Sequence, residues 1–325
     1  MKRVIFLVTF IICIVVLSAC SNDEKTTKND QLKVGIMLSD AGLGDQSFSD
    51  MGFMGLEKAR DELGISFDYR ELKDTETYEK GLEQLVEEGN DLIIGLGFSI
   101  QEDMEKVAKK YPDSSFLIID AQSELPNVNS ITFKEEEGSF LIGVVAGMKT
   151  KSDTVGFVGG EEAELIRKFE KGFVEGVKAV NPDAKILSKY SGTFGDDKLG
   201  ESIAREMIAA GADYIYPAAG FTGVGVILEA QRQGVYSFGV DSDQFYLAEK
   251  SVVSSMVKQV DVAIYDTVKE LVETGKIAEK NKQLGLKENG VAIAPIRAIE
   301  LIPSEQTKID QFIEDISNGT ITVLE

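Results

Sequence analysis

Short runs of β-branched and apolar residues alternate with longer segments of helical periodicity from residue 32 onward. Residues 32–38 and 66–70 are predicted strands. Residues 55–63 between them form a predicted helix, because their apolar residues recur on one helical face. The alternation continues to about residue 133, with further strands expected at 91–95, 115–119 and 128–133 and further helices at 77–88 and 100–110.

The same pattern restarts after residue 134. A Gly-rich apolar segment at 137–148 predicts a packed helix, and the tail at 292–325 predicts a strand, a helix and a short terminal strand. Strands that alternate with helices of about 10–15 residues are typical of parallel sheets, so two such runs predict an α/β chain with two doubly wound lobes. Between the first helix and the tail we expect strands at 154–158, 185–190, 213–216, 236–240 and 252–258, and helices at 163–180, 198–210, 224–233 and 262–273.

The N-terminus has the pattern of a secretory signal. Lys2 and Arg3 precede an apolar run at 4–17, which ends in Leu-Ser-Ala-Cys at residues 17–20. This ending resembles a bacterial lipobox, which implies cleavage after residue 19 and a lipid on the sulfur of Cys20. An uncleaved transmembrane anchor is the alternative, but the apolar run is shorter than the roughly 18 residues that a span requires. Residues 21–31 are polar and charged, which is typical of a flexible tether.

Composition narrows the chemistry. The 325 residues suit two domains of about 150 residues each. The chain has no histidine, and its only cysteines are Cys13 and Cys20. Ser-His-Asp and Cys-His catalysis and His-ligated metals are therefore excluded, as are disulfides, thiolate enzymes and all-cysteine zinc sites in the part after residue 20.

Acidic residues dominate the charge. Lys and Arg total 34 against 55 Asp and Glu, so the formal net charge is −21, and removal of the signal makes it more negative. A nucleic-acid binder needs a basic face, so this balance argues against nucleic acid and against electrostatic docking on anionic lipid. With 43% apolar and 27% charged residues, the composition is that of an ordinary soluble globular protein.

The residues that follow the predicted strands are the candidate ligand contacts, because open α/β sheets bind ligands beyond the carboxyl ends of their strands. Carboxylates, aromatic rings and glycines recur there. Carboxylates accept hydrogen bonds from hydroxyl or ring N–H groups, aromatic faces stack on planar rings, and glycine lets the backbone approach a ligand. The candidates are Asp40, Asp45, Phe48, Phe98, Asp120, Phe194, Gly220, Phe221, Asp241 and Lys258.

Each candidate also has a structural interpretation. Asp and Gly after a strand also serve as helix caps and turn residues, and the phenylalanines could belong to the core. The run Glu135-Glu136-Glu137 is interpreted as a solvated face or a helix start. The spacing of Gly220, Gly223 and Gly225 is not that of a dinucleotide fingerprint, and no twelve-residue calcium pattern surrounds Asp241. We therefore expect no metal, no cofactor and no catalytic residue.

Several segments together resemble one family. Residues 40–49 look like D-x-G-x-x-D-x-S-F-N, with Ser49 in place of the Asn, and residues 131–141 are similar to I-x-F-x-x-E-E-G-S-F-L. Residues 239–244 and 254–258 also fit. These segments resemble the basic membrane protein family, also called the purine nucleoside receptor A or membrane lipoprotein C type, whose members are substrate-binding lipoproteins of ABC transporters. The resemblance covers almost the whole mature chain.

The resemblance implies a type I periplasmic-binding-protein fold with three crossovers between two lobes and a ligand cleft between them. The N-terminal lobe would comprise residues 32–133 and about 259–290, and the C-terminal lobe residues 134–258 and about 291–325. By position, a purine would stack between Phe48 and Phe221, with Phe98 and Phe194 in reserve. Base-edge contacts would fall to Asp120 or Asp40 and ribose contacts to Asp241, Lys258 and the Gly220 backbone.

These implications predict a lipid-anchored receptor for purine nucleosides. It would sit on the extracytoplasmic face of the cell membrane through Cys20, act as a monomer without nucleic acid, and dock on ABC transporter permease subunits when hinge closure traps the ligand. Three alternatives stay open. The same fold could bind a sugar or an autoinducer, it could serve as a sensor or regulator, or the chain could be a nucleoside hydrolase that uses paired carboxylates.

Overall fold

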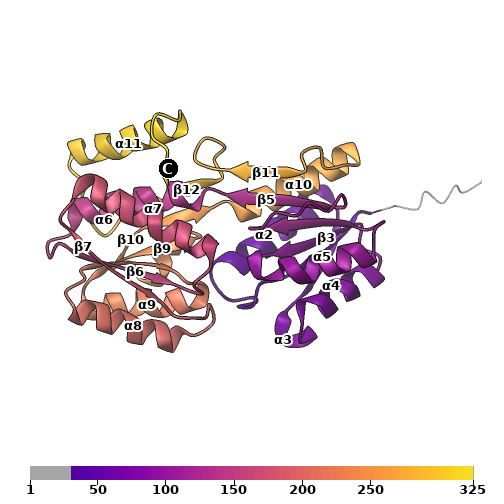
Figure 1. Cartoon of the computed structure of the whole chain (residues 1–325), viewed down its shortest axis with the longest axis horizontal. Coiled ribbons are helices and arrows are strands. Elements are labelled where there is room, and N and C mark those ends of the chain that lie inside the picture. Colours follow the sequence, from indigo (N-terminus) through magenta and orange to yellow (C-terminus); the bar gives the residue numbers. More distant parts are fainter. Residues whose placement is uncertain (1–30, 325) are drawn as a thin grey trace, which may run out of the picture. The chain divides into compact units, whose positions relative to one another are not determined.

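Two six-stranded sheets with helices on both faces make up the part of the chain that the structure, a computed structural model, describes (Figure 1). That part is residues 31–324. The predicted signal at 1–19, Cys20 and the predicted tether up to residue 30 lie outside it. The contacts within Leu32–Glu325 make that range one unit.

The first sheet is entirely parallel and has the strand order β11-β5-β4-β3-β1-β2. Figure 1 shows α2 and α10 on one of its faces and α4 and α5 on the other. Its strands are β1 (Lys33–Met37), β2 (Ser66–Arg70), β3 (Leu92–Leu96), β4 (Ser115–Ile119), β5 (Val128–Phe133) and β11 (Asn281–Leu284). Its helices are α2 (Phe48–Leu63), α3 (Leu72–Thr75), α4 (Tyr78–Glu87), α5 (Gln101–Lys110) and α10 (Val260–Thr274), with the short η1 (Phe98–Ile100) after β3.

The second sheet repeats this order as β12-β10-β9-β8-β6-β7, and only its edge strand β12 runs antiparallel. The helices α6 and α7 cover one face, α8 and α9 cover the other, and α11 packs on α6 (Figure 1). Its strands are β6 (Thr154–Gly159), β7 (Lys185–Tyr190), β8 (Tyr214–Ala218), β9 (Tyr236–Asp241), β10 (Val252–Lys258) and β12 (Val291–Ile293). Its helices are α6 (Glu135–Lys149), α7 (Glu164–Val180), α8 (Asp197–Ala209), α9 (Gly220–Gln233) and α11 (Pro303–Ser317), with η2 (Gln244–Leu247) after β9.

The chain passes between the two sheets three times. It leaves the first sheet after β5 and enters α6, returns after β10 through Gln259 into α10, and crosses finally between β11 and β12. The crossovers lie side by side, since Lys134 N donates to Leu284 O at 3.0 Å and Gln259 N donates to Gly290 O at 2.9 Å. Two parallel-dominated sheets in an α/β chain confirm the predicted fold class, and the N-terminal and C-terminal lobes are hereafter the units built on the first and second sheets.

Glycines let helix pairs in the C-terminal lobe pack backbone to backbone. A Cβ on Gly176 of α7 would lie 1.9 Å from Phe140 O of α6, and one on Gly143 would lie 2.1 Å from Phe173 O. Likewise, a Cβ on Gly225 of α9 would lie 1.9 Å from Asp197 O of α8. Real Cβ atoms do not approach an oxygen so closely, so these positions keep the helices at their observed separation.

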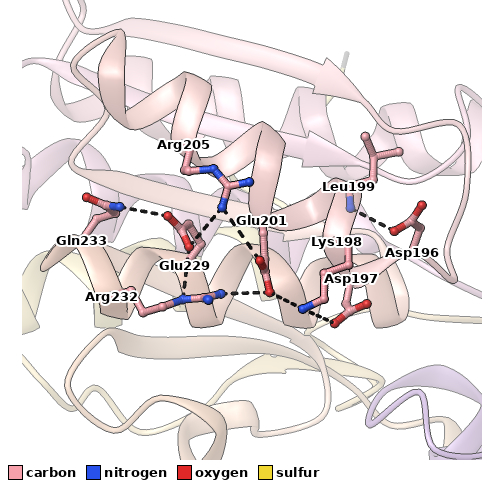
Figure 2. Close-up of polar contacts among 9 residues, drawn as sticks. All are labelled: Asp196, Asp197, Lys198, Leu199, Glu201, Arg205, Glu229, Arg232 and Gln233. Carbon is pink, nitrogen blue, oxygen red and sulfur yellow. Dashed lines mark hydrogen bonds and ion pairs between the residues drawn. The ribbon is translucent and has the colours of Figure 1, made fainter.

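An ion-pair network joins α8 and α9 (Figure 2). Arg232 reaches Glu229 Oε2 at 3.1 Å and Glu201 Oε1 at 3.0 Å, and Lys198 Nζ reaches Glu201 Oε1 at 2.8 Å. Hydrogen bonds from Lys198 and Arg232 lower the pKa of Glu201 to about 2. Arg205 also contacts both carboxylates, with Nη1 at 3.5 Å from Glu229 Oε2 and 3.8 Å from Glu201 Oε2. The Glu201 and Glu229 side chains are only 12% and 4% exposed, so Arg205 and Arg232 are the counter-charges that allow the two carboxylates to be buried.

The structure departs from the predicted elements at four places: two helix starts, one strand that was not predicted and one predicted strand that is absent. The helix α2 begins at Phe48 rather than 55, and α9 begins at Gly220 rather than 224, because their first halves contain glycines and polar residues that give no clear apolar periodicity. The strand β11 was not predicted, since its sequence Asn-Lys-Gln-Leu lacks apolar alternation and pairs only through its backbone with β5. The predicted terminal strand is absent, because residues 318–324 form turns and bends.

Candidate functional site

A cavity lies where the carboxyl ends of the two sheets face each other, and it spans about 630 Å³ with its open mouth included. In each sheet the first strand lies between the second and the third, so the order in which the strands are connected reverses beside the first strand. Residues that follow β1, β3 and β8 line the cavity at these ends. Nine of the ten predicted site residues line it: Asp40, Asp45, Phe48, Phe98, Asp120, Phe194, Gly220, Asp241 and Lys258.

Two aspartates hold equivalent places in the two lobes. Asp120 directly follows β4, and Asp241 ends β9. Both have left-handed backbone, with φ of 70° and 63°. Such a conformation is uncommon for a residue with a side chain, although aspartate adopts it more readily than most. The backbone therefore turns sharply at the end of each strand, and both side chains reach the cavity.

Each aspartate has a partner from the other lobe. Asp120 Oδ2 accepts a hydrogen bond from Lys258 Nζ at 2.5 Å, while Oδ1 is buried and has no partner among the described residues. Asp241 Oδ2 accepts from Ser47 Oγ at 2.6 Å. Burial raises the pKa of Asp241, and the Lys258 charge and the Ser47 hydroxyl act against that rise. The free Asp120 oxygen is available to a ligand that donates a hydrogen bond.

Lys258 is the charged centre of the cavity wall. It is 1% exposed, and besides Asp120 its Nζ contacts Glu135 Oε1 at 3.0 Å. Burial alone lowers the pKa of Lys258, but the carboxylates of Asp120, Glu135 and Asp241 outweigh it, so the net shift is upward and Lys258 stays charged. The ammonium also lies over the rings of Phe48, Phe133 and Phe169 at 5.1, 5.0 and 5.7 Å from their centroids.

Glu135 is a residue whose environment the sequence did not reveal. The interpretation of residues 135–137 as a helix start is confirmed, because α6 begins at Glu135. The interpretation as a solvated face is wrong, since Glu135 is fully buried and Glu137 is 7% exposed. Burial raises the pKa of Glu135 to about 7, against the opposing charge of Lys258. Charges next to each other in sequence indicated solvent, but Glu135 has its counter-charge on β10, and Glu137 pairs with Lys134 at 2.9 Å.

Aromatic rings enter the cavity from both lobes. Phe48 at the start of α2 and Phe98 in η1 belong to the N-terminal lobe, and Phe194 and Phe169 belong to the C-terminal lobe. Phe98 and Phe194 meet edge to face, with ring centroids 6.4 Å apart. Phe169 was not among the predicted site residues, because it lies within α7, ten residues after the end of β6, rather than directly after a strand.

Phe221 lies away from the cavity lining, half-buried at the start of α9. The aromatic wall of the C-terminal lobe is instead formed by Phe169 and Phe194. The position of Phe194 leaves no room for a side chain at two neighbouring glycines. A Cβ on Gly160 would lie 2.2 Å from Phe194 Cε1, and one on Gly220 would lie 3.2 Å from Phe194 O. Thr222 N donates to the same oxygen at 3.0 Å, which ties the Phe194 loop to α9.

Asp45 lines the cavity, but its carboxylate is occupied by backbone. Oδ1 accepts from Ser47 N at 2.9 Å, and Oδ2 accepts from Ser49 N at 2.8 Å. Asp45 therefore caps the N-terminus of α2 in place of Ser47, whose own hydroxyl is directed to Asp241. Burial raises the pKa of Asp45 to about 6, while these N–H donors act to lower it.

Asp40 and Tyr78 line the N-terminal-lobe side of the cavity. Asp40 is exposed as a whole residue, but protein atoms surround its carboxyl group closely enough that desolvation raises its pKa. Tyr78, the first residue of α4, was not predicted, because no motif marks it. Burial raises the pKa of Tyr78, and the carboxylates of Asp40, Glu161 and Asp103 add to the rise. Asp40 therefore offers a hydrogen-bond acceptor here, and the neutral Tyr78 hydroxyl can both donate and accept.

The loop before α2 contacts the C-terminal lobe through hydrogen bonds. Gln46 O accepts from Ser242 Oγ and from Gln244 Nε2, each at 3.0 Å, and Tyr246 OH donates to Gln46 Oε1 at 3.1 Å. Gln46 itself has left-handed backbone with φ 56°. These contacts close the cleft beside Asp241 and Phe48.

The site as a whole combines planar apolar walls with acceptor oxygens and one ammonium group. Such a cavity suits a planar ring that carries hydroxyl or N–H donors. Within residues 31–324, no group of three or more His, Cys, Asp or Glu side chains is placed to hold a metal ion. The helices of the same range are all too short or too polar to cross a bilayer.

Comparison with known proteins gives consistent results. The family model described as ABC transporter substrate-binding protein PnrA-like matches residues 32–323. The chain is 34% identical to a CD4+ T-cell-stimulating antigen of Listeria innocua, over 96% of this chain and 95% of that protein. It is 32% identical to the ABC transporter nucleoside-binding protein BmpA of Lactococcus lactis, over 95% of each chain.

Among solved structures, an ABC transporter solute-binding protein from Aeropyrum pernix superposes with a TM-score of 0.82 at 27% identity, over 90% of this chain and 92% of that one. This similarity confirms the type I periplasmic-binding-protein fold that the sequence motifs implied.

Proposed function

The chain belongs to the PnrA-like substrate-binding proteins of ABC transporters, and from this premise we propose that it is a lipid-anchored, monomeric receptor for purine nucleosides. The receptor binds a nucleoside in the cleft between its lobes and presents it to permease subunits. One observation carries the proposal: aromatic rings from both lobes face a single cavity whose wall also holds Asp120, Asp241 and Lys258. A purine nucleoside offers the matching pair of groups, a planar base and a hydroxyl-bearing ribose.

The aromatic walls supply the base contacts in this proposal. Phe48 stacks on one side of the purine, and Phe169 or Phe194 faces it from the C-terminal lobe, in place of the Phe221 partner that the sequence motifs implied. Each base–aromatic stack contributes about 1–3 kcal/mol. Asp40 accepts from the base edge, since its carboxylate lies in the same cavity.

The ribose contacts come from the charged end of the cavity. Asp241 and the unpartnered Asp120 Oδ1 accept from ribose hydroxyls, and Lys258 donates to a ribose oxygen. Hydrogen bonds to charged groups contribute about 1.5–3 kcal/mol each. The carboxylates would repel a phosphate group, so we expect inosine to bind much more tightly than its 5′-monophosphate.

Calorimetric titration of the mature protein tests the ligand class. Adenosine, guanosine, inosine, uridine and ribose are titrated in turn, with purine nucleosides expected to bind most tightly. The proposal fails if none binds below millimolar concentration, or if ribose binds as well as inosine, which would favour a sugar receptor. Inosine recovered unchanged after incubation supports a receptor, whereas release of free hypoxanthine would show a hydrolase.

Asp241→Ala tests the ribose contact directly. We expect the variant to lose most of its affinity for inosine while its melting temperature stays close to that of the wild type. Asp183→Ala is the matched control, because Asp183 is exposed in the same lobe and lies outside the cavity lining. Affinity retained in Asp241→Ala removes this residue from the binding site.

Cys20→Ser tests the lipid anchor. The wild-type chain, expressed in a bacterium, is expected to partition into the detergent phase and to incorporate labelled fatty acid, and the Cys20→Ser chain is expected to do neither. A wild-type chain that carries no lipid contradicts the anchoring part of the proposal and leaves the ligand part to the calorimetry.

A further inference from the structure

A buried carboxylate at the first crossover has no role in the nucleoside contacts proposed above. Glu135 opens α6 directly after the chain leaves β5, it is 0% exposed, and it does not line the cavity. Neither of its carboxylate oxygens has a hydrogen-bond partner among the described residues, so its contact with Lys258 is an ion pair rather than a hydrogen bond. A buried carboxylate is costly unless a counter-charge is close, and Lys258 Nζ, 3.0 Å from Glu135 Oε1, is that counter-charge.

Lys258 connects this hidden carboxylate to the ligand cavity. Its Nζ also contacts Asp120 Oδ2 at 2.5 Å, and Lys258 and Asp120 both line the cavity. The ammonium is thus held by one carboxylate of the cavity wall and by another behind that wall. Asp120 belongs to the N-terminal lobe, while Glu135 begins a helix that packs on β10, the strand that ends in Lys258. When the lobes separate, Glu135 therefore stays with Lys258.

We propose that Glu135 is a positioning residue: it is the permanent counter-charge that holds the Lys258 ammonium at the cavity wall, and it sets ligand affinity without touching the ligand. The effect on affinity rests on the proposed function, whereas the ion pair itself does not. Only the ionised carboxylate can act as a counter-charge, so the affinity must follow the protonation of Glu135.

The direction of the pH effect follows from this role. Burial raises the pKa of Glu135 to about 7, so it is ionised above that pH and neutral below it. We therefore expect the affinity for inosine to fall by about tenfold between about pH 8 and about pH 5.5. The charged and titratable groups that face Glu135 or its partner ammonium are Lys258 of β10, Asp120 after β4, Lys168 of α7, Tyr216 of β8 and Asp241 of β9.

Glu135→Gln separates this role from a purely structural one. The amide of the variant is neutral at every pH, so at pH 8 its affinity for inosine should already lie about tenfold below that of the wild type. Its affinity should also change less than that of the wild type between the two pH values, and any change that remains belongs to other cavity groups such as Asp45, whose pKa burial raises to about 6. Glu136→Gln is the matched control, because Glu136 lies in the same turn and makes no contact with Lys258. A Glu135→Gln variant that keeps the pH profile of the wild type overturns the proposal.

A second measurement needs no ligand and remains informative if a variant binds nothing. Urea denaturation is compared for Lys258→Met, Glu135→Leu and the double variant. Removing Glu135 in the absence of Lys258 removes an uncompensated buried charge, so the double variant should unfold at a higher urea concentration than Lys258→Met alone. If Glu135→Leu lowers the urea midpoint by the same amount in the wild type and in Lys258→Met, Glu135 stabilises the fold independently of Lys258 and the proposal is wrong.

The two measurements also separate this proposal from the proposed function. A wild-type protein that binds no nucleoside refutes the proposed function, and the urea cycle alone then decides whether Glu135 and Lys258 act as a pair. A wild-type protein that binds inosine with no difference from Glu135→Gln at either pH refutes the positioning role and leaves the proposed function intact.

Discussion

Gly160→Ala should weaken ligand binding through the ring that it displaces. Gly160 directly follows β6, and a Cβ there would lie 2.2 Å from Cε1 and 2.4 Å from Cδ1 of Phe194. Ordinary van der Waals contact begins near 3.4 Å, so the ring must retreat by about 1.2 Å. Phe194 lies on a half-buried loop, so its ring can move, and it would then leave its edge-to-face contact with Phe98.

The expected loss follows from what one aromatic wall contributes. One base–aromatic stack is worth about 1–3 kcal/mol, or roughly a 5- to 150-fold change in dissociation constant. A displaced ring keeps part of its contact, so we expect Gly160→Ala to bind inosine about tenfold more weakly, and Phe194→Ala to lose at least as much. Calorimetric titration gives the dissociation constants, and thermal denaturation checks that the fold is retained.

Gly195→Ala is the matched control for this prediction. Gly195 follows Phe194 in the same loop, and its added Cβ would meet Thr193 Oγ1 only at 4.0 Å. Neither Gly160 nor Gly195 has left-handed backbone, so alanine brings no backbone strain at either position. If Gly160→Ala binds inosine within about twofold of Gly195→Ala, the Phe194 ring does not need this place and the reasoning fails.

Three further predictions concern stability. Lys258→Met leaves the buried carboxylates unpaired and should lower the free energy of unfolding by about 3–5 kcal/mol at neutral pH. Without the lysine, the native pKa values of these carboxyl groups lie above their unfolded values, so the folded variant gains stability as the pH falls and the loss should be smaller near pH 5. Urea denaturation at both pH values measures the loss, and an equal loss at neutral pH and at pH 5 would contradict this reasoning. Gly176→Ala should cost about 2–3 kcal/mol rather than gain helix propensity, because its Cβ would lie 1.9 Å from Phe140 O; an unchanged melting temperature would refute this. Thr77→Ala should cost about 1 kcal/mol in urea denaturation, because the Thr77 hydroxyl accepts from Lys80 N at the start of α4; no change would mean that the cap is dispensable.

The strand ends were the part of the site that the sequence could predict. Parallel strands bring their carboxyl ends to one edge, so Asp120, Asp241 and Lys258 could be expected at the cavity from their places after strands. Phe221 also has such a place, yet it lies away from the lining while Phe194 and Phe169 form the wall. The direction in which a side chain points from a loop depends on packing against distant segments, such as Gly160 against Phe194.

Local periodicity determined the order of strands and helices, since apolar spacing reports which face of each element is buried. It was least informative where few apolar side chains mark the element, as in the edge strand β11 and the glycine-containing first halves of α2 and α9. Whether the acidic run at residues 135–137 is buried or exposed was decided by the tertiary structure alone. Its charge indicated solvent, but Glu135 is buried because the fold brings to it a lysine that is itself paired with Asp120, 138 positions away. A charge can be buried only beside its counter-charge, and which residues become neighbours is a property of the folded chain.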